Sequence, residues 1–231
     1  MRRLAATSRG FLISTLIIGL TWSYNSFAQD FNNHNWYFGA TSDAIRFNKS
    51  DNQATLVNDQ NPNFGQGGSA VATDPWSGEL LFYTDGAKIY DDSHVLMPGV
   101  AGAELNGNIN ANQQVAVSPV PNDPDQYFIF VNAGGTIEYT KIDMNLPGNA
   151  AAGNPPRGDV VGAEKSVATG VTTTGPLLVF AGGDPIEYFL LTQNSNSLEF
   201  EIYSIGAASL NLLTSAQNPN SVLAESFSLH K

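Results

Sequence analysis

Cysteine is absent from this 231-residue chain, and basic residues are scarce. Without cysteine the chain has no disulfide, no thiol nucleophile and no lipid-modified cysteine anchor. Its 10 Lys and Arg residues stand against 21 Asp and Glu residues, a formal net charge of −11. Such a surface repels nucleic acid and anionic lipid, so no nucleic-acid partner is expected. Two explanations of the acidity stay open: solubility in a saline exterior, or binding of divalent cations by carboxylate loops.

Long apolar runs are also missing. The longest occupies residues 11–22, whereas a membrane-spanning helix needs roughly 20 residues. Arg2, Arg3 and Arg9 precede this run and Ser26-Phe27-Ala28 follows it, which is the pattern of a secretory signal. We therefore expect residues 1–28 to be a cleaved signal peptide, residues 29–231 to form one domain and no membrane span to remain. The expected location is extracellular or at the cell surface, with the periplasm as the alternative; a retained membrane anchor is the rival interpretation of the leader.

Sustained helical periodicity does not occur after the leader, because apolar residues fall in short runs separated by Gly, Pro, Asn and Asp. Instead, three segments share one plan, in which an apolar strand, a tight turn and a second strand follow one another. These segments are residues 79–90, 126–139 and 187–203. Asp85-Gly86 and Gly134-Gly135 predict two-residue type I′ turns in the first two.

Two features of these hairpins predict which faces are buried. The first strand of each pair is apolar throughout, which indicates burial on both faces between stacked sheets. In the last strand, Leu198, Phe200 and Ile202 alternate with Glu199, Glu201 and Tyr203. That alternation predicts one buried face, carrying the apolar set, and one wet face.

A further strand precedes each hairpin, at residues 69–73, 114–118 and 176–180, so the plan recurs as a three-stranded unit. Units of about 45 residues with three or four short strands are typical of propeller blades. Residues 35–39, 44–47 and 53–57 supply three earlier strands, and residues 222–229 supply a late one. The sequence thus predicts an all-β fold, a β-propeller-like array of antiparallel three- to four-stranded sheets with about four blades. The ring is then small and closed, open, or part of a longer propeller; a β-sandwich is the alternative.

Several stretches resemble a known family. Residues 35–39 (NWYFG), residues 78–86 (GELLFYTDG), Ile89-Tyr90-Asp91, His94 and Met97-Pro98 carry the resemblance, which continues more loosely to about residue 205. They are similar to the amino-terminal propeller-like region of large secreted Bacteroidetes surface proteins, which commonly end in a gliding-motility-associated or type IX secretion sorting domain. The resemblance implies a surface or binding role. No sorting domain is visible in this sequence, and the resemblance transfers no catalytic residue.

Residues for catalysis or metal binding are few. His34, His94 and His230 are the only histidines, and we expect His94 in a solvated turn rather than in a triad. Carboxylates that could cleave a glycosidic bond are Asp85, Asp91, Asp92 and Glu138, although turn formation is the stronger explanation of the first three. Asp123 and Asp125 offer hard oxygen ligands suited to calcium, without a complete loop template. No other cofactor is expected.

Aromatic residues are the remaining candidates for ligand binding. Trp36, Trp76 and Tyr90, with Asp91, could form a stacking surface for a sugar or a peptide; the alternative is that Trp36 belongs to the core and Trp76 caps a turn. Three hypotheses result. The preferred one is a non-enzymatic extracellular module for adhesion or assembly with protein or glycan. The others are a secreted carbohydrate-active enzyme or sugar-binding protein, and a structural fragment that completes its ring with a partner chain.

Overall fold

The computed structural model describes residues 34–39, 41–48, 50–51, 53–182, 187–207 and 209–216. These residues form four antiparallel sheets of three to five strands, two short 3₁₀ helices and no α-helix. The prediction of an all-β fold is confirmed. The expected signal peptide, the start at Gln29 and the strand expected in residues 222–229 lie outside the described residues. Within the described part, no helix has the length and apolarity needed to cross a membrane.

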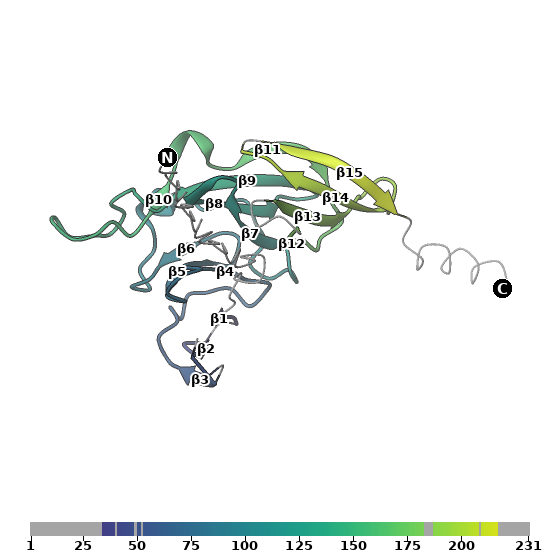
Figure 1. Ribbon diagram of the computed structural model, residues 1–231. Coiled ribbons are helices and arrows are strands. Elements are labelled where there is room, and N and C mark those ends of the chain that lie inside the picture. The colour runs from purple at the N-terminus through teal and green to yellow at the C-terminus, as the bar shows by residue number, and fades with distance from the viewer. Residues whose placement is uncertain are drawn as a thin grey trace, which may run out of the picture.

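Each sheet is built mainly from strands that follow one another in the chain (Figure 1). The first sheet holds β1 (Asn35–Tyr37), β2 (Ala44–Phe47) and β3 (Ala54–Val57), and the second holds β4 (Ala70–Thr73), β5 (Leu80–Thr84) and β6 (Ile89–Asp91). The third holds β7 (Val115–Val120), β8 (Asp123–Asn132), β9 (Thr136–Asp143), β10 (Asp159–Val160) and β11 (Val167–Thr172). The fourth holds β12 (Leu178–Ala181), β13 (Tyr188–Gln193), β14 (Phe200–Ile205) and β15 (Leu210–Ala216). The 3₁₀ helices are η2 (Pro98–Val100) and η3 (Gly162–Glu164).

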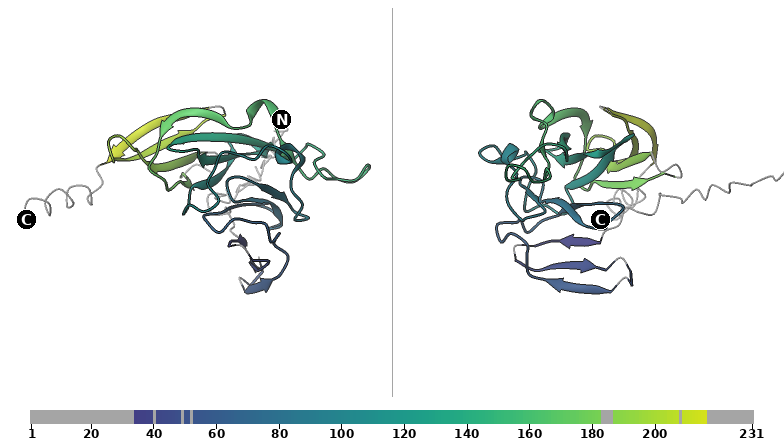
Figure 2. Two further views of the ribbon diagram at one scale, coloured as in Figure 1. Left: turned by 180° about the vertical axis from the view of Figure 1, so that it is seen from behind. Right: turned by 60° about the vertical axis from the view of Figure 1, so that its left-hand side comes forward.

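The four sheets follow one another in chain order, with the first at one end and the fourth at the other (Figures 1 and 2). The leading strand of each sheet contacts the leading strand of the next, from β1 to β4, β7 and β12. Three separate apolar cores fill the spaces between consecutive sheets. The described residues show no closure of a ring.

Burial of the second strand differs between inner and terminal sheets. In the third sheet, every side chain of β8 from Tyr127 to Asn132 is buried, as a strand covered on both faces requires. In the fourth sheet, β13 buries only Leu190 and Thr192, while Phe189 and Leu191 stay half-exposed. The prediction of burial on both faces is confirmed for β8 and is wrong for β13. The reason is that, in the part of the chain that the structure describes, a neighbouring sheet packs on one face of this sheet only.

Two local predictions about turns have different outcomes. Gly134 and Gly135 both have positive φ, 67° and 101°, as a type I′ turn needs. Between β5 and β6 only Gly86 has positive φ, and the carboxylate of buried Asp85 instead accepts hydrogen bonds from the backbone N–H groups of Ala87 and Lys88 at 3.0 and 2.7 Å. That connection is therefore a longer turn organised by a side chain, and the two-residue prediction is wrong there.

The alternation in β14 is present, but its orientation is the reverse of the prediction. Glu201 and Tyr203 are buried against the third sheet, whereas Phe200 is 40% exposed. Burial of the carboxylate is tolerated because it accepts hydrogen bonds from Asn194 Nδ2 at 3.0 and 3.1 Å and from the Tyr203 hydroxyl at 2.5 Å. The more apolar face of this strand thus points away from the core. Three strands, β10, β11 and β15, were not predicted.

Candidate binding groove

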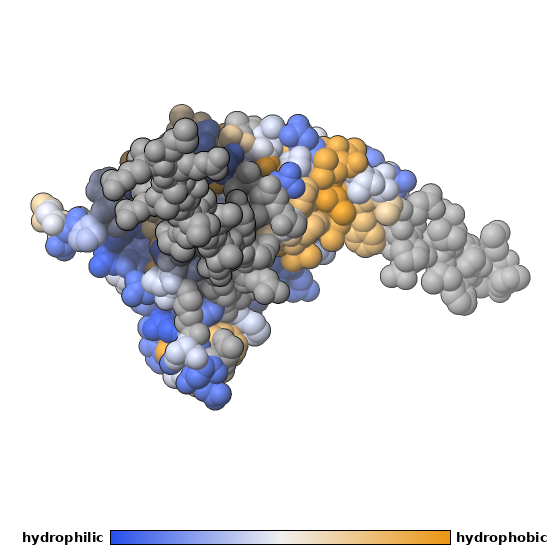
Figure 3. Space-filling view, viewed as in Figure 1, coloured by the Kyte–Doolittle hydropathy of each residue, from blue (hydrophilic) through white to orange (hydrophobic). Residues whose placement is uncertain are grey.

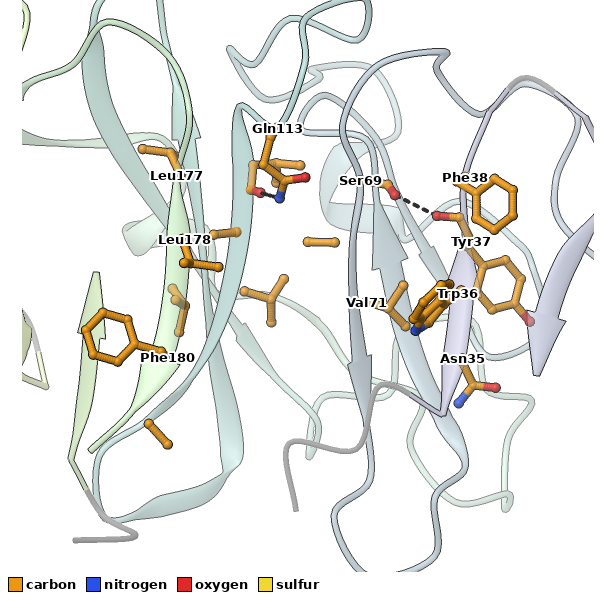
Figure 4. A pocket seen from close by; sticks show the side chains of 16 residues that line it. Asn35, Trp36, Tyr37, Phe38, Ser69, Val71, Gln113, Leu177, Leu178 and Phe180 are labelled. Carbon is orange, nitrogen blue, oxygen red and sulfur yellow. Dashed lines mark hydrogen bonds between the residues drawn. The ribbon is translucent and has the colours of Figure 1, made fainter. Parts of the chain in front are cut away.

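An open groove with a volume of about 620 Å³ runs across the leading strands of all four sheets. In Figure 4, Trp36, Phe38 and Val71 lie on one side of it, and Leu178 and Phe180 on the other. Small residues of β4 and β7 form its floor: Ala70, Val115, Ala116 and Val117. The groove therefore joins residues that are more than 140 positions apart in the sequence.

Strand alternation explains why Trp36 reaches the groove. Its neighbours in β1 face the second sheet: Tyr37 stacks on Tyr83 with ring centroids 4.3 Å apart, and Asn35 Nδ2 donates hydrogen bonds to Thr73 Oγ1 and to a backbone carbonyl. Successive side chains of a strand point to opposite faces. Trp36 consequently points away from the second sheet and is 46% exposed.

The opposite wall is built in the same way. In and just before β12, Leu177 and Val179 pack into the core between the third and fourth sheets. Leu178 and Phe180 point to the other face and are 53% and 37% exposed. A backbone hydrogen bond of 2.9 Å from Leu177 N to the carbonyl of Gln113 ties this wall to the floor.

The described residues that line the groove are uncharged, although the chain as a whole is strongly acidic. Two of the groove's polar side chains are already engaged with the backbone: Ser69 Oγ donates to the carbonyl of Tyr37 at 2.6 Å, and Gln113 Nε2 donates to the carbonyl of Val115 at 3.4 Å (Figure 4). The polar groups of Asn35 and Tyr37 are bonded to other side chains. Chemically, the described lining offers apolar contact area, three exposed aromatic rings and no acid or base.

In the structure, the residues of the predicted aromatic site lie in different places. Trp36 lies in the groove, whereas Trp76 is 67% exposed in the turn between β4 and β5, outside the groove lining. Tyr90 and Asp91 are 3% and 0% exposed in the interior of the second sheet. The structure thus does not bring the four side chains together on one surface.

The predicted acids have structural partners. Asp85 and Asp91 are buried and accept backbone hydrogen bonds, which is the turn-forming role. Asp92 forms an ion pair with Arg157, and Glu138 accepts a hydrogen bond from Asn106 Nδ2 at 2.8 Å. None of these acids lines the groove.

Asp123 and Asp125 lie at the start of β8, where Asp123 Oδ1 accepts the backbone N–H of Asp125 at 3.2 Å. In the part of the chain that the structure describes, no group of three or more His, Cys, Asp or Glu side chains gathers in a way that could hold a metal ion. These two aspartates therefore stand without a third such ligand.

A polar cluster missed by sequence analysis fastens the first sheet to the second. The Tyr37 hydroxyl donates to Asp59 Oδ1 at 3.1 Å and accepts from Arg46 Nη2 at 3.0 Å, and the same guanidinium lies 3.0 Å from Asp59 Oδ2. His94 Nε2 is 3.7 Å from that carboxylate, with its ring against Tyr37 and Tyr83. His94 lies in a turn as predicted, with its N–H bonded to the carbonyl of Asp91 at 3.0 Å. The expectation that it is solvated is wrong, because this packing leaves its side chain only 22% exposed.

Burial and the nearby charge of Asp59 raise the pKa of Tyr37 to about 12, against the opposing effect of Arg46. The hydroxyl therefore stays protonated and holds the cluster together at neutral pH. Because its members come from residues 37 to 94, no local motif announces them. Their role is to join two sheets, and Tyr37 is the one member of the cluster among the described groove residues.

Sequence analysis proposed Trp36 alone among the groove residues, and those it missed include Phe38, Val71, Gln113, Leu178 and Phe180. The available signal was the strand that precedes each predicted hairpin. If those leading strands gather at the centre of the array, their residues line a common surface, which is what the structure shows.

No protein-family model, no curated protein and no solved structure matches this chain. Any functional conclusion therefore depends on the groove and on the arrangement of the sheets.

Proposed function

We propose that this chain is an exported, non-enzymatic binding module with a propeller-like arrangement of its four sheets, and that it binds an extended apolar segment of a protein partner in the groove. The observation that carries the proposal is the uncharged groove with exposed Trp36 and Phe38 in a chain of net charge −11. An extracellular or cell-surface location agrees with the predicted signal peptide and with the resemblance to secreted surface proteins.

Backbone geometry supports a peptide ligand. The leading strands β1, β4, β7 and β12 are each an edge strand of their own sheet, so four strand edges border the groove. An extended peptide can hydrogen-bond to such an edge while its alternate side chains enter apolar pockets. Charged ligands are disfavoured, because the lining offers no opposite charge to offset their desolvation.

A glycan is the second candidate, favoured by the same two rings. Trp36 and Phe38 are 46% and 44% exposed and could stack on sugar faces. This candidate is weaker because a sugar also needs several free polar groups. The hydroxyl of Ser69 and the amide of Gln113 are both bonded to backbone carbonyls.

The test is a selection of displayed random twelve-residue peptides on the purified chain, followed by affinity measurements. We expect enrichment of peptides with alternating apolar residues. Removing a ring from the groove should weaken their binding at least tenfold, about 1.4 kcal/mol. Trp36→Ala and Phe38→Ser are the groove variants, and Trp76→Ala is the matched control, because it removes an exposed ring outside the groove.

Peptides that bind the two groove variants as tightly as the native chain would refute the proposal. Calorimetric titration with β-1,4-linked glucose and N-acetylglucosamine hexasaccharides examines the second candidate. The glycan would be supported instead if a hexasaccharide gives a saturable heat of binding that disappears in Trp36→Ala, and if the selection enriches no peptide.

A further inference from the structure

The fourth sheet exposes a continuous apolar face on the side away from the third sheet. Cross-strand pairing places Leu178, Leu191 and Ile202 in one row and Phe180 beside Phe189 in the next. Figure 3 shows an apolar surface over these strands. Leu178, Phe180 and Phe200 are 53%, 37% and 40% exposed. Exposed apolar patches of this kind on soluble proteins mark interaction sites.

The first sheet exposes an apolar face at the opposite end of the array. Trp36, Ile45 and Leu56 form one row across β1, β2 and β3, and Phe47 packs edge-on against Trp36 with centroids 5.2 Å apart. Leu56 is 70% exposed. The face toward the second sheet, by contrast, carries buried Tyr37 and Ala44.

The two exposed apolar faces, the outer face of the first sheet and the outer face of the fourth, are called the free faces. Each could serve as the neighbouring sheet that packs on the other. Every sheet in the interior of the array packs one face against the preceding sheet and the other against the following one. Among the described residues, no sheet covers the outer face of the first sheet or the outer face of the fourth. The sequence of β13 and the orientation of β14 agree with a covered face, because both strands turn apolar side chains outward.

We propose that a second copy of this chain covers both faces, with the first sheet of each copy packed on the fourth sheet of the other. The result is a two-fold symmetric ring of eight sheets. This inference rests on the propeller-like arrangement proposed above, and eight sheets lie within the four to eight blades of closed propellers. A head-to-tail contact that closes in this way leaves neither face open, unlike a contact between two identical faces, which would leave one sheet per copy uncovered.

The area available is sufficient for a stable pair. Outside the groove, the ring of Phe200 retains roughly 80 Å² to bury, since aromatic side chains bury about 150–250 Å² when fully covered. Together with exposed Leu56 and the partly exposed Ile45, Phe47, Phe189, Leu191 and Ile202, this amounts to several hundred Å² per contact. Two contacts bring the total to about the 1,000 Å² expected of a specific interface.

Strand position gives the proposal a register that can be tested. Leu56 lies on the third strand of the first sheet and Phe200 on the third strand of the fourth sheet. In the proposed ring these two positions face each other across the contact. Neither residue lines the groove.

The first measurement is the mass of the purified chain in solution, by light scattering and by sedimentation at tens of micromolar. We expect a dimer. Leu56→Glu and Phe200→Glu should each shift it to monomer, because each buries a carboxylate in an apolar contact. Trp76→Glu, which changes an exposed ring on neither free face, should remain dimeric.

The second measurement is cross-linking through introduced cysteines, which is site-specific because the chain has no cysteine of its own. Leu56→Cys and Phe200→Cys are prepared separately, mixed and treated with a short bismaleimide. Cross-linking should require the mixture, since each contact joins one of each position, and Trp76→Cys should not cross-link to either. Cysteine is a mild change, so this readout remains valid even where a glutamate variant fails to fold.

Several outcomes would overturn the proposal. These are a monomer at these concentrations, a dimer unaffected by both glutamate variants, or cross-linking of Leu56→Cys to itself. Dimer formation only after removal of residues 217–231 would show that the chain's own segment covers the fourth sheet. The groove proposal fails separately: Phe38→Ser should lose the selected peptides and keep the dimer.

Discussion

The carboxylate of Asp91 should be one of the most stabilising single groups in the second sheet. It is fully buried at the end of β6. Oδ1 accepts hydrogen bonds from Ser93 N, Ser93 Oγ and Val95 N at 2.9, 2.7 and 3.1 Å. Oδ2 accepts one from Asn149 Nδ2 at 2.8 Å, which anchors a loop 58 residues away.

Replacing Asp91 by Asn keeps the shape of the side chain and the three bonds to Oδ1. The new amide, however, turns its N–H groups toward those of Asn149, so one bond is lost and two donors face each other. A hydrogen bond to a charged group contributes about 1.5–3 kcal/mol. We therefore expect Asp91→Asn to lower the free energy of unfolding by about 2–3 kcal/mol at pH 7.

This loss should depend on pH. Burial works to raise the pKa of Asp91, but the hydrogen bonds from Ser93, Asn149 and Val95 outweigh it and hold the pKa below its ordinary value. Stability from a depressed carboxyl pKa is present above the unfolded value, about 3.9, and is lost as the pH falls through the folded value. The difference between native and variant should therefore be constant from pH 7 to about 5 and should shrink below about pH 4.

The assay is urea unfolding of both proteins at pH 7, 5 and 3, followed by tryptophan fluorescence. Asp92→Asn is the matched control: that carboxylate is exposed and paired with Arg157, so its loss should cost at most about 1 kcal/mol. A loss below about 0.5 kcal/mol for Asp91→Asn at pH 7, or an equal loss at pH 7 and pH 3, would refute the reasoning.

Three further predictions follow from buried contacts. Gly107→Ala should destabilise by about 3 kcal/mol or more, because a Cβ there would lie 2.3 Å from a backbone oxygen, while Gly162→Ala, with no atom within 4 Å, should be near neutral in thermal unfolding. Glu201→Leu should cost about 1–3 kcal/mol by leaving the Tyr203 hydroxyl unpaired, and adding Tyr203→Phe should recover part of this in a double-mutant cycle. Stability should fall as the pH rises from about 10 through 12, where Tyr37 with its raised pKa ionises, and absorbance at 295 nm should show tyrosine ionisation together with unfolding; Tyr37→Phe should weaken this dependence.

Strand positions could be predicted because they follow from local pattern. Apolar runs bounded by Asp-Gly, Gly-Gly and Asp-Pro marked β4, β5 and β13 within one residue, whereas β8 begins at Asp123, three residues before the predicted start. By contrast, β15 (Leu210–Ala216) is an edge strand that is exposed along almost its whole length, so burial imposes no alternation on it. Its pairing to β14 depends on tertiary contact, which local pattern does not record.

The candidate site was only partly predictable, because it is made where separate sheets meet. Trp36 could be singled out as a large ring, but its partners across the groove, Leu178 and Phe180, look like any apolar strand residues. Tyr90 was a reasonable choice for the same reason as Trp36, yet it stacks on Tyr83 in the core with centroids 5.3 Å apart. Which rings are exposed depends on which sheet has a neighbour, and a single sequence does not state that.

The outward apolar face of β14 allows the second-copy proposal to be tested through stability alone. If no second copy covers Phe200, Phe200→Ser should cost only what its burial within one chain contributes, and the Tm of the native chain and of the variant should not depend on protein concentration. If a second copy covers this ring, unfolding is coupled to dissociation, so the native Tm should rise with concentration and Phe200→Ser should lower both the Tm and its concentration dependence. Calorimetry over a hundredfold concentration range distinguishes the two cases. A native Tm that does not change with concentration would refute the proposal that a second copy covers the apolar face of the fourth sheet.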